Sequence, residues 1–566
     1  MRSSLNKAQE WLDPFFDQKS RIIVQNWIDQ DAPELEEAFY KDLEFGTGGM
    51  RGIMGVGTNR INKYTIGKAT LGLANYLIEY FPNQELSVAI AFDSRNNSLL
   101  FAQFAANVLS SKGIKAYLFE DLRPTPLLSF AVRYLKCNAG IVITASHNPK
   151  EYNGYKVYWN DGAQLVSPND KGVLSSVNEI KSFKEIDFKG DENLIKIIDP
   201  SVEAAYFEKV KALIFDSQKT DKSIPIVFTS IHGTGETMIP KLMDQLGFAN
   251  FRSVKEQSEP NGDFPTVKSP NPEERSALEM AIDLAKEQNA ELVLGTDPDT
   301  DRVGLAIKNN EGEWILLNGN QAGSILINYL LEKLNSSEYE HSFICKTIVT
   351  TQLIEEIAHS YDVKCINTLT GFKYIAQVIR EQEGKMNFIG GGEESFGYLA
   401  GDFVRDKDAV MAVAIFSQIA GICKANGSNL YEYLLSIYKK HGVYKERLLS
   451  VSKKGKAGLE AITQLMENYR SNTPKELAGE KVISFSDYLS GFTKNTINGN
   501  EEKIGLEKSN VLQFLTEKGS LITVRPSGTE PKIKYYFSVK EDGNNSIENL
   551  LIEAELHLDR LEKEFI

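Results

Sequence analysis

The sequence predicts an α/β fold with several domains, and two observations support this prediction. Short apolar runs alternate with longer helical patterns through most of the chain. This alternation is typical of parallel or mixed α/β sheets, because a helix crosses from each strand to the next. The second observation is the length of 566 residues, which exceeds what a single hydrophobic core supports. We therefore expect three or four domains.

The apolar runs that we interpret as core strands all end in small or polar residues. They are residues 87–94, 139–144, 224–233, 290–297 and 387–394. Helical patterns lie between them, and residues 276–288 repeat apolar side chains at helical spacing. Ligands of α/β sheets bind at the carboxyl ends of the strands. We therefore expect the chemistry of this protein in the loops that follow these runs.

The last part of the chain has a different pattern. Residues 453–518 are charged and polar, residues 521–539 predict two strands around a turn, and the tail from residue 546 predicts an amphipathic helix. A smaller α+β domain is the interpretation. Composition shifts predict four domains, with limits at residues 1–200, 201–319, 320–445 and 446–566.

Composition argues against several classes of protein. The chain has 63 lysines and arginines against 77 aspartates and glutamates, a net charge of −14. This charge repels nucleic acid and anionic membranes, so we expect neither as a partner. The four cysteines are far apart and form no CxxC pair, which argues against a zinc site or a disulfide framework. Reduced thiols in a cytoplasmic protein are the expectation.

No segment predicts secretion or membrane insertion. The N-terminus lacks the long apolar stretch of a secretory signal. The longest mostly apolar run, residues 409–422, is shorter than the roughly 20 residues that span a bilayer. We interpret it as a buried helix.

A serine and a histidine stand at the end of the predicted strand at residues 139–143. The segment reads TASHNPKEYNGYKVYW, so Ser146, His147 and an Asn-Pro turn follow the strand directly. A core strand that breaks at once into a polar turn places these side chains where an α/β fold binds ligands. For His147 the alternative is a turn histidine that only orients its neighbours. For Lys156, in the same segment, the alternative is a surface lysine.

Three aspartates follow the predicted strand at residues 290–294 at alternate positions. In GTDPDTDRVG they are Asp297, Asp299 and Asp301, and alternate side chains of an extended segment share one side. Carboxylates at this density repel one another unless a cation joins them, and Mg²⁺ prefers oxygen ligands. We therefore predict a magnesium site, with a solvated acidic turn as the alternative.

Two other interpretations of this segment lead to different proteins. An EF-hand loop beginning at Asp297 requires glycine at its sixth position and glutamate at its twelfth. The sequence has Arg302 and Lys308 there, so an EF-hand is excluded. A phosphotransferase like the haloacid dehalogenases also begins with DxDx(T/V) after a strand, and its first aspartate is the nucleophile. The sequence has Asp301 where Thr or Val belongs, and this phosphatase alternative stays open.

Two glycine-containing segments offer anion contacts. RPSGTEPK, residues 525–532, combines Arg525, two hydroxyls and Gly528, which suit a phosphate group. A tight β-turn is the alternative. FGTGGMRG, residues 45–52, is a second small-residue loop that contains Arg51. The chain has no GxxxxGK[ST] motif, so a nucleotide P-loop is absent.

Two more segments place charged groups after predicted strands. GGGEESFGYL, residues 390–399, puts Glu393 beside Ser395, and a carboxylate with a hydroxyl suits sugar hydroxyls. The alternative is a loop that caps the next helix. RDKD, residues 405–408, places Lys407 between acids, with an exposed ion-pair cluster as the alternative.

Taken together, these segments resemble the motifs of the α-D-phosphohexomutase superfamily, the phosphoglucomutases and phosphomannomutases. TASHNP is similar to its phosphoserine loop, DPDTDR to its metal loop, GEESFG to its sugar loop and RPSGTEPK to its phosphate loop. The motifs come in the family's order and the resemblance covers nearly the whole chain. It implies a heart-shaped, four-domain architecture with three α/β domains and a smaller C-terminal α+β domain.

The resemblance implies a mutase that works through a phosphoserine. Ser146 would carry a phosphoryl group, and glucose 1,6-bisphosphate would form as the intermediate. An oxygen of the Ser146 phosphoryl group would bind Mg²⁺ together with the three aspartates. The further catalytic residues that the resemblance implies are His147, Lys156 and Lys407. The general base is either Lys407 or His147, and Lys407 is preferred.

The resemblance also implies a set of residues that contact the substrate. They are Thr47, Arg51, Arg302, Thr370, Gly371, Glu393, Ser395, Lys407, Arg525, Ser527, Gly528 and Thr529. Of these, residues 525–529 would hold the phosphate that is not reacting. Glu393 and Ser395 would hold the sugar hydroxyls.

The sugar loop indicates a glucose phosphate as the substrate. It reads GEESFG, as in the glucose-type enzymes, and not the GEMSGH of bacterial enzymes that also use mannose. Alternatives are a phosphomannomutase, another phosphosugar mutase such as a phosphopentomutase, a sugar phosphatase that uses Asp297, and a binding protein without activity. We expect a phosphosugar as the partner, and a monomer or weak homodimer in the cytoplasm.

Overall fold

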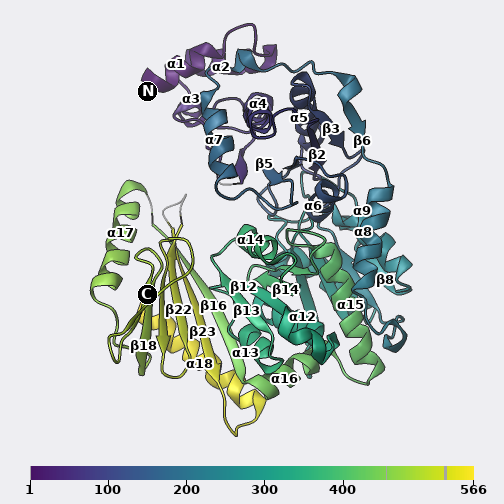
Figure 1. Cartoon of the computed structure of the whole chain (residues 1–566), viewed down its shortest axis with the longest axis vertical. Coiled ribbons are helices and arrows are strands. Elements are labelled where there is room, and N and C mark those ends of the chain that lie inside the picture. Colours follow the sequence, from purple (N-terminus) through teal and green to yellow (C-terminus); the bar gives the residue numbers. More distant parts are fainter. Residues whose placement is uncertain (1, 47, 454, 528–531, 566) are drawn as a thin grey trace. The chain divides into compact units, whose positions relative to one another are not determined.

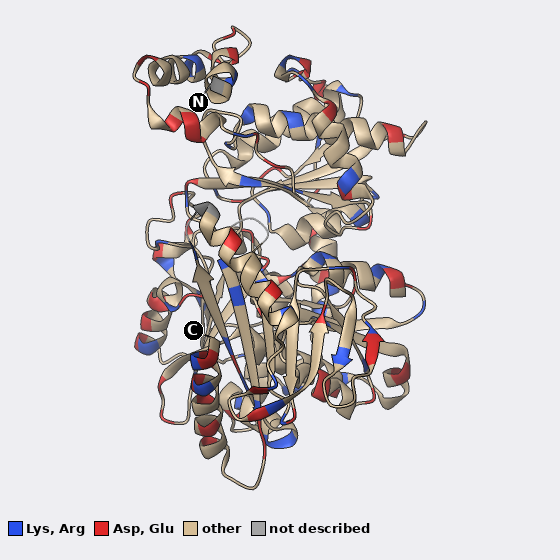
Figure 2. Ribbon diagram, turned by 90° about the vertical axis from the view of Figure 1, so that its left-hand side faces the viewer, with Lys and Arg blue, Asp and Glu red and all other residues tan. Residues whose placement is uncertain are grey.

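A computed structural model describes residues 2–46, 48–453, 455–527 and 532–565. It divides into two compact units, which are described separately (Figure 1). The first unit comprises Met1–Asn318, Phe372–Gly384 and Ser395–Gly427. The second comprises Gly319–Gly371, Lys385–Glu394 and Ser428–Ile566. Acidic and basic residues are interspersed along the elements of both units (Figure 2).

The first unit begins with three helices that pack around Trp11. They are α1 (Arg2–Glu10), α2 (Gln18–Asp29) and α3 (Pro33–Phe39). The Trp11 side chain is 1% exposed and stacks on Phe16 with ring centroids 4.6 Å apart. Tyr64 meets the same indole edge-on at 5.2 Å and donates a hydrogen bond to Asp17. Because Tyr64 belongs to α4, these contacts attach the three helices to the domain that follows.

The first sheet has the strand order β1-β5-β4-β2-β3-β6. Its strands are β1 (Gly49–Ile53), β2 (Ser87–Phe92), β3 (Lys115–Leu118), β4 (Ala139–Ile143), β5 (Tyr152–Trp159) and β6 (Ile195–Ile197). The helices of this part are α4 (Lys63–Tyr80), α5 (Ser98–Ser111), α6 (Thr125–Tyr134) and α7 (Asn169–Glu179). β2, β3, β4 and β6 are parallel, whereas β5 is antiparallel to β1 and β4. β2 and β4 confirm the first two predicted strands.

The second sheet has the order β11-β10-β9-β7-β8. Its strands are β7 (Ile226–Thr229), β8 (Phe251–Ser253), β9 (Leu292–Thr296), β10 (Val303–Lys308) and β11 (Trp314–Leu317). The helices are α8 (Ser201–Ala212), α9 (Gly235–Gln245), α10 (Lys255–Ser258) and α11 (Arg275–Glu287). β7 is parallel to β8 and β9, and β10 is antiparallel to both of its neighbours. β7, β9 and α11 confirm the predicted elements.

Three later elements complete the first unit. They are α14 (Phe372–Gln382), β15 (Gly397–Ala400) and α15 (Ala409–Ala425). Residues 409–421 are all buried, which confirms the prediction of a buried helix. Among the described residues, no single helix is long and apolar enough to cross a membrane; α15 and α16 (Leu430–His441) pass that test only when they are counted together.

The second unit begins with a parallel sheet. Its strands β12 (Ser342–Thr347), β13 (Lys364–Thr368) and β14 (Asn387–Glu393) have the order β13-β12-β14. The helices α12 (Gly319–Lys333), α13 (Leu353–Ser360) and α16 accompany it. β14 confirms the last of the predicted core strands, and all three strands end at the same edge of the sheet.

The C-terminal sheet is antiparallel, with the order β16-β23-β22-β21-β18-β19-β20 and β17 beside β18. Its strands are β16 (Val443–Ser452), β17 (Glu476–Leu477), β18 (Glu480–Asp487), β19 (Phe492–Asn495), β20 (Glu501–Lys503), β21 (Leu512–Thr516), β22 (Leu521–Pro526) and β23 (Lys532–Glu541). Two helices, α17 (Gly455–Ser471) and α18 (Ile547–Phe565), belong to the same domain. β22, β23 and α18 confirm the predictions. β17 to β21 lie in the polar segment, where no strand was predicted.

A buried histidine links α18 to this sheet. His557 Nδ1 lies 2.8 Å from Glu541 Oε1, and its Nε2 lies 3.1 Å from Glu480 Oε1. Glu480 also accepts a hydrogen bond from the Thr516 hydroxyl at 2.6 Å, and Lys518 Nζ is 3.8 Å away. Burial alone would lower the pKa of His557, but the two carboxylates raise it. Burial alone would raise the pKa of Glu480, but hydrogen bonds from His557, Thr516 and Ser520 lower it to about 2.

We predict that His557 stabilises the C-terminal domain more at acidic than at alkaline pH. Its folded pKa lies above the unfolded value of about 6.5, so its contribution is complete below that value and is lost as the pH rises through the folded pKa. Hydrogen-exchange protection of α18 peptides should therefore differ most between wild type and His557→Gln near pH 6 and converge at alkaline pH. His341→Gln, at an exposed position, is the control. A difference that is the same at every pH would contradict the prediction.

Candidate active site

Ser146 lies in the turn that follows β4. Its backbone has a φ of 52°, a left-handed conformation that residues other than glycine rarely adopt. Thr144 Oγ1 accepts a hydrogen bond from its N–H at 2.8 Å. The side chain is 3% exposed, and its Oγ donates to Asp297 Oδ2 at 2.9 Å and lies 3.2 Å from His147 Nδ1. The turn therefore holds the hydroxyl beside the aspartate loop.

Arg95 fixes the rest of the serine loop. Its guanidinium donates hydrogen bonds to four backbone carbonyls, those of Ser146, Asn148, Pro149 and Tyr152. Its Nε lies 3.3 Å from Asp93 Oδ2, and both side chains are fully buried. This arginine was not predicted from the sequence. The signal was present, because Asp93 and Arg95 directly follow β2, at the strand end where chemistry was expected.

The three aspartates lie in the loop between β9 and β10 and are almost fully buried. Asp297 Oδ1 accepts hydrogen bonds from the backbone N–H groups of Asp301 and Arg302, both at 3.1 Å. Asp299 Oδ2 accepts one from the Thr125 hydroxyl at 3.0 Å. One oxygen of each aspartate lies within 4.8 Å of the others. The alternative of a solvated acidic turn is therefore wrong.

The aspartates fit a hard divalent cation. Asp299 Oδ1 and Asp301 Oδ1 are buried and have no hydrogen-bond partner within the described part of the chain. Burial, followed by the neighbouring carboxylates, raises the pKa of Asp297 well above its usual value. Three negative charges at this density therefore need compensation. A cation that takes oxygen ligands supplies it.

Two lysines supply part of the positive charge. Lys156, on β5, places its Nζ 2.7 Å from Asp299 and 3.3 Å from Asp301. Lys407 Nζ lies 3.3 Å from Asp301 as well. Their side chains are 13% and 9% exposed. Burial alone would lower the pKa of Lys156, but the two carboxylates raise it. The alternatives of a surface lysine and of an exposed ion-pair cluster are therefore wrong.

Asp406 holds Lys407 in this position. Its Oδ1 accepts a hydrogen bond from Lys407 Nζ at 3.0 Å, and its Oδ2 accepts from Tyr158 at 2.7 Å and Gln164 at 3.1 Å. The carboxylate is itself buried. Tyr158 and Gln164 lie 248 and 242 residues before it in the chain, so no local sequence pattern could have indicated this cluster.

Three further predicted residues complete the cluster in the first unit. Burial, together with the charges of Arg302 and Arg51, lowers the pKa of His147 to about 2, so its ring is neutral. Arg51 Nη1 donates to Asn148 Oδ1 at 2.8 Å. Arg302 Nη1 lies 2.6 Å from Glu273 Oε1. The structure thus brings the serine loop, the aspartate loop and these basic groups together in one unit.

The predicted sugar loops meet within the second unit. Glu393, at the end of β14, is 6% exposed, and its Oε1 accepts a hydrogen bond from the Gly371 N–H at 2.9 Å. Residues 370–371 and Glu393 come from the ends of β13 and β14. Ser395 belongs to the first unit. The segment leads into the strand β15 and not into a helix, so the alternative of a helix-capping loop is wrong.

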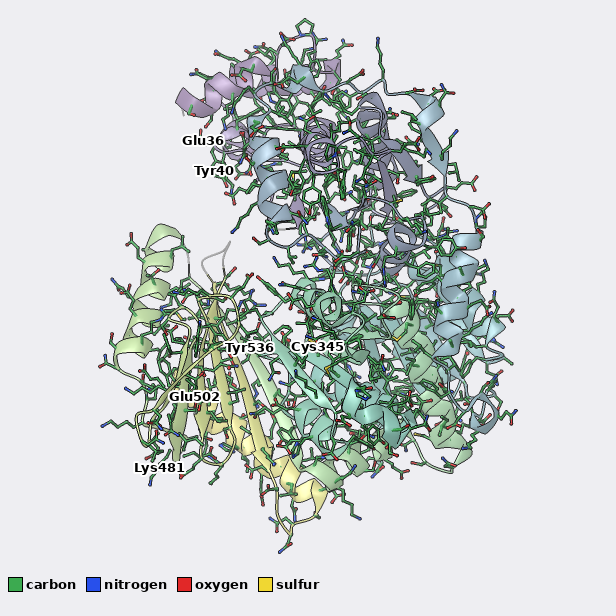
Figure 3. All side chains as sticks on the ribbon, viewed as in Figure 1. Glu36, Tyr40, Cys345, Lys481, Glu502 and Tyr536 are labelled. Carbon is green, nitrogen blue, oxygen red and sulfur yellow. The ribbon has the colours of Figure 1, made fainter. Side chains whose placement is uncertain are left out.

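Arg525 also belongs to the second unit, on β22. Its charge acts on the phenol of Tyr536 on β23, which is labelled in Figure 3. Burial and the charge of Glu394 raise the pKa of Tyr536, and Arg525 opposes this effect. Ser527 donates its backbone N–H to the Lys532 carbonyl at 2.7 Å. Three other predicted substrate residues lie outside the described residues: Gly528 and Thr529 in the RPSGTEPK segment, and Thr47 in the FGTGGMRG segment.

Four family models match the chain in order. They are described as Phosphoglucomutase/phosphomannomutase, alpha/beta/alpha domain I (residues 42–184), domain II (204–312), domain III (318–441) and C-terminal domain (454–545). These matches confirm the four-domain architecture of three α/β domains and a distinct C-terminal domain. They leave the first 41 residues, with helices α1 to α3, outside the family's domains.

Relatives and solved structures agree with these matches. A phosphoglucomutase of Staphylococcus haemolyticus is 39% identical over 94% of this chain and 96% of its own. One of Staphylococcus aureus (strain MRSA252) is 40% identical over 92% and 93%. A putative phosphomannomutase from Thermus thermophilus shares the fold, with a TM-score of 0.69 at 21% identity over 93% of this chain and 99% of that one. The chain therefore belongs to the phosphoglucomutase/phosphomannomutase family.

Proposed function

We propose that this protein is a phosphoglucomutase that interconverts glucose 1-phosphate and glucose 6-phosphate. The observation that carries the proposal is the Ser146 hydroxyl, 2.9 Å from Asp297 in a cluster of three buried aspartates. Phosphoryl transfer requires positioning and charge compensation more than covalent chemistry by the protein, and this arrangement offers both. The staphylococcal relatives that are named phosphoglucomutase support the same activity.

Ser146 carries the phosphoryl group in the proposed cycle. The bond between phosphorus and Ser146 Oγ breaks as a hydroxyl oxygen of the bound sugar phosphate bonds to phosphorus and loses its proton. The product is glucose 1,6-bisphosphate, which turns over in the site. Its other phosphoryl group then returns to Ser146, and the oxygen that it leaves regains a proton. The phosphoryl group is conserved over the cycle, so no co-reactant is consumed.

The residues around Ser146 divide the remaining tasks in this proposal. The three aspartates would hold Mg²⁺, which would supply positive charge to compensate the phosphoryl group. His147, 3.2 Å from Ser146 Oγ, orients the carrier oxygen. Lys156 compensates the negative charge of Asp299. Lys407, held by Asp406, exchanges the proton: its neutral amine takes the proton of the sugar hydroxyl and returns it at the second transfer.

Both units supply proposed substrate contacts. Glu393, with Ser395, holds sugar hydroxyls, and Arg525 holds the phosphate that is not reacting. The other proposed contacts are Thr47, Arg51, Arg302, Thr370, Gly371, Lys407, Ser527, Gly528 and Thr529. The proposal includes domain limits at residues 1–200, 201–319, 320–445 and 446–566, and a monomer or weak homodimer in the cytoplasm.

Ser146→Ala is expected to abolish mutase turnover and to leave the fold intact. The loop backbone is held by Arg95 and Thr144, so the side chain contributes little packing, and no other group replaces the carrier. Ser111→Ala on α5 is the matched control. Mass spectrometry of the wild type should locate phosphate on Ser146. An acid-labile phosphate on Asp297, or full turnover by the variant, would favour the phosphatase and refute the mutase.

Removal of divalent metal with EDTA is expected to stop turnover, and Mg²⁺ is expected to restore it. Asp299→Asn removes one anionic oxygen from a hard-cation site, so the Mg²⁺ affinity should fall by more than about tenfold. Titration of Mg²⁺ against activity measures this. Asp263→Asn, at an exposed carboxylate, is the control. Undiminished turnover by the EDTA-treated protein would disprove the metal assignment.

The enzyme is expected to prefer glucose 1-phosphate over mannose 1-phosphate. The GEESFG loop at Glu393 is the basis, because it matches the glucose-type sequence. The values of kcat/KM for the two substrates decide the matter, with ribose 1-phosphate as a further substrate. A higher value for mannose 1-phosphate would replace the proposal with a phosphomannomutase, and a higher value for ribose 1-phosphate with a phosphopentomutase.

A further inference from the structure

The first unit contains a cavity whose lining includes no residue of the serine or aspartate loops. It has a volume of about 650 Å³ and is lined by α2, α3, the loop from Met54 to Lys63 and the start of α5. This volume falls within the roughly 300–1,000 Å³ of small-molecule sites. One wall belongs to the first 41 residues, which lie outside the family's first domain. The other lining residues, between Met54 and Phe104, belong to the family's first domain.

Aromatic side chains form much of its wall. Trp27 of α2, Tyr64 of α4, and Phe101 and Phe104 of α5 all line the cavity. Trp27 and Phe104 are only partly buried, and Leu100 at the same wall is 44% exposed. Large apolar side chains that stay partly exposed around a concave surface indicate a ligand with a flat apolar part, which the rings can stack against.

Basic side chains outnumber acidic ones in the lining, although the chain as a whole is acidic. Lys19, Arg60 and Lys63 face Asp17 and Glu34, in a chain of net charge −14. The Asp17 carboxylate accepts hydrogen bonds from Ser20 and Tyr64 and lies 3.7 Å from Lys63 Nζ, and Arg60 Nη2 lies 3.4 Å from Glu37 Oε2. The Lys63 ammonium lies 4.8 Å from the Tyr64 ring, where the cation borders the aromatic wall. An anionic group on the ligand suits this arrangement.

The start of α5 adds an anion-binding element. Helices α2 and α4 also begin at the cavity, but Asp17 and Asn62 cap them with side-chain hydrogen bonds. Asn97, the N-cap residue of the 14-residue α5, makes no such bond. Its side-chain nitrogen instead lies 3.6 Å from Met54 Sδ. The first N–H groups of a helix without a side-chain cap bind anions well.

We propose that this cavity binds a small ligand that combines an aromatic ring system with a phosphate group, the chemistry of a nucleoside monophosphate. The ring lies against Trp27 and Phe104, and the phosphate lies at the start of α5 beside Lys63. The site is independent of the proposed phosphosugar site and uses none of its residues.

Isothermal titration with AMP tests the proposal on the full-length protein. AMP should bind the wild type, and Trp27→Ala should weaken binding roughly 5- to 150-fold through loss of stacking. Lys63→Met, which keeps the apolar stem, should weaken it by a similar factor. Ile22→Ala on α2 and Lys68→Met on α4, both outside the lining, are matched controls and should bind as the wild type does. Thermal melting of each variant confirms that it is folded.

Three further titrations show where AMP binds and which of its parts the cavity recognises. AMP should still bind in the presence of saturating glucose 6-phosphate, whereas competition would place it in the phosphosugar site and overturn the proposal. AMP should bind more tightly than adenosine or inorganic phosphate alone, because the proposal needs both parts of the ligand. Adenosine binding as tightly as AMP would remove the phosphate from the proposal. No detectable binding of AMP at millimolar concentration, or binding unchanged by Trp27→Ala, would refute it.

Discussion

Mutual repulsion among three buried carboxylates is the constraint on which the first unit's site depends. Asp297, Asp299 and Asp301 are withdrawn from water, so their charges must be compensated within the protein or by a bound cation. Backbone N–H groups, Lys156 and Lys407 provide part of this compensation. They arrive from β5, from the aspartate loop itself and from the segment before α15. The groups that compensate the aspartate charges therefore come from distant parts of the chain.

The serine loop is organised by the opposite arrangement, a buried cation bonded to one carboxylate and to the carbonyls of the loop. The Arg95 guanidinium is paired with Asp93 and bonded to successive carbonyls of the loop. Charge-assisted hydrogen bonds of this kind are stronger than neutral ones, and their planar geometry fixes direction as well as distance. A loop held in this way keeps its shape when the group at its tip changes charge, as the proposed carrier role of Ser146 requires.

Much of this arrangement could be predicted from the sequence because strands end where ligands bind. The apolar runs before Ser146 and Asp297 are the strands β4 and β9, and the polar residues after them meet as expected. Asp406 could not be predicted, because its partners are set by tertiary structure more than 240 residues away. The strands β19 and β20 were missed for a different reason: most of their residues stay exposed, so no apolar periodicity marks them.

The left-handed backbone at Ser146 has a consequence for which amino acids suit the proposed carrier position. Serine and threonine both offer a hydroxyl, yet a branched Cβ is strongly disfavoured at a φ near 52°. Of these two residues, serine therefore fits this backbone conformation with less strain. Threonine can adopt this conformation at a cost in strain, as Thr300 does in the aspartate loop with a φ of 55°. The backbone conformation therefore favours serine over threonine at this position.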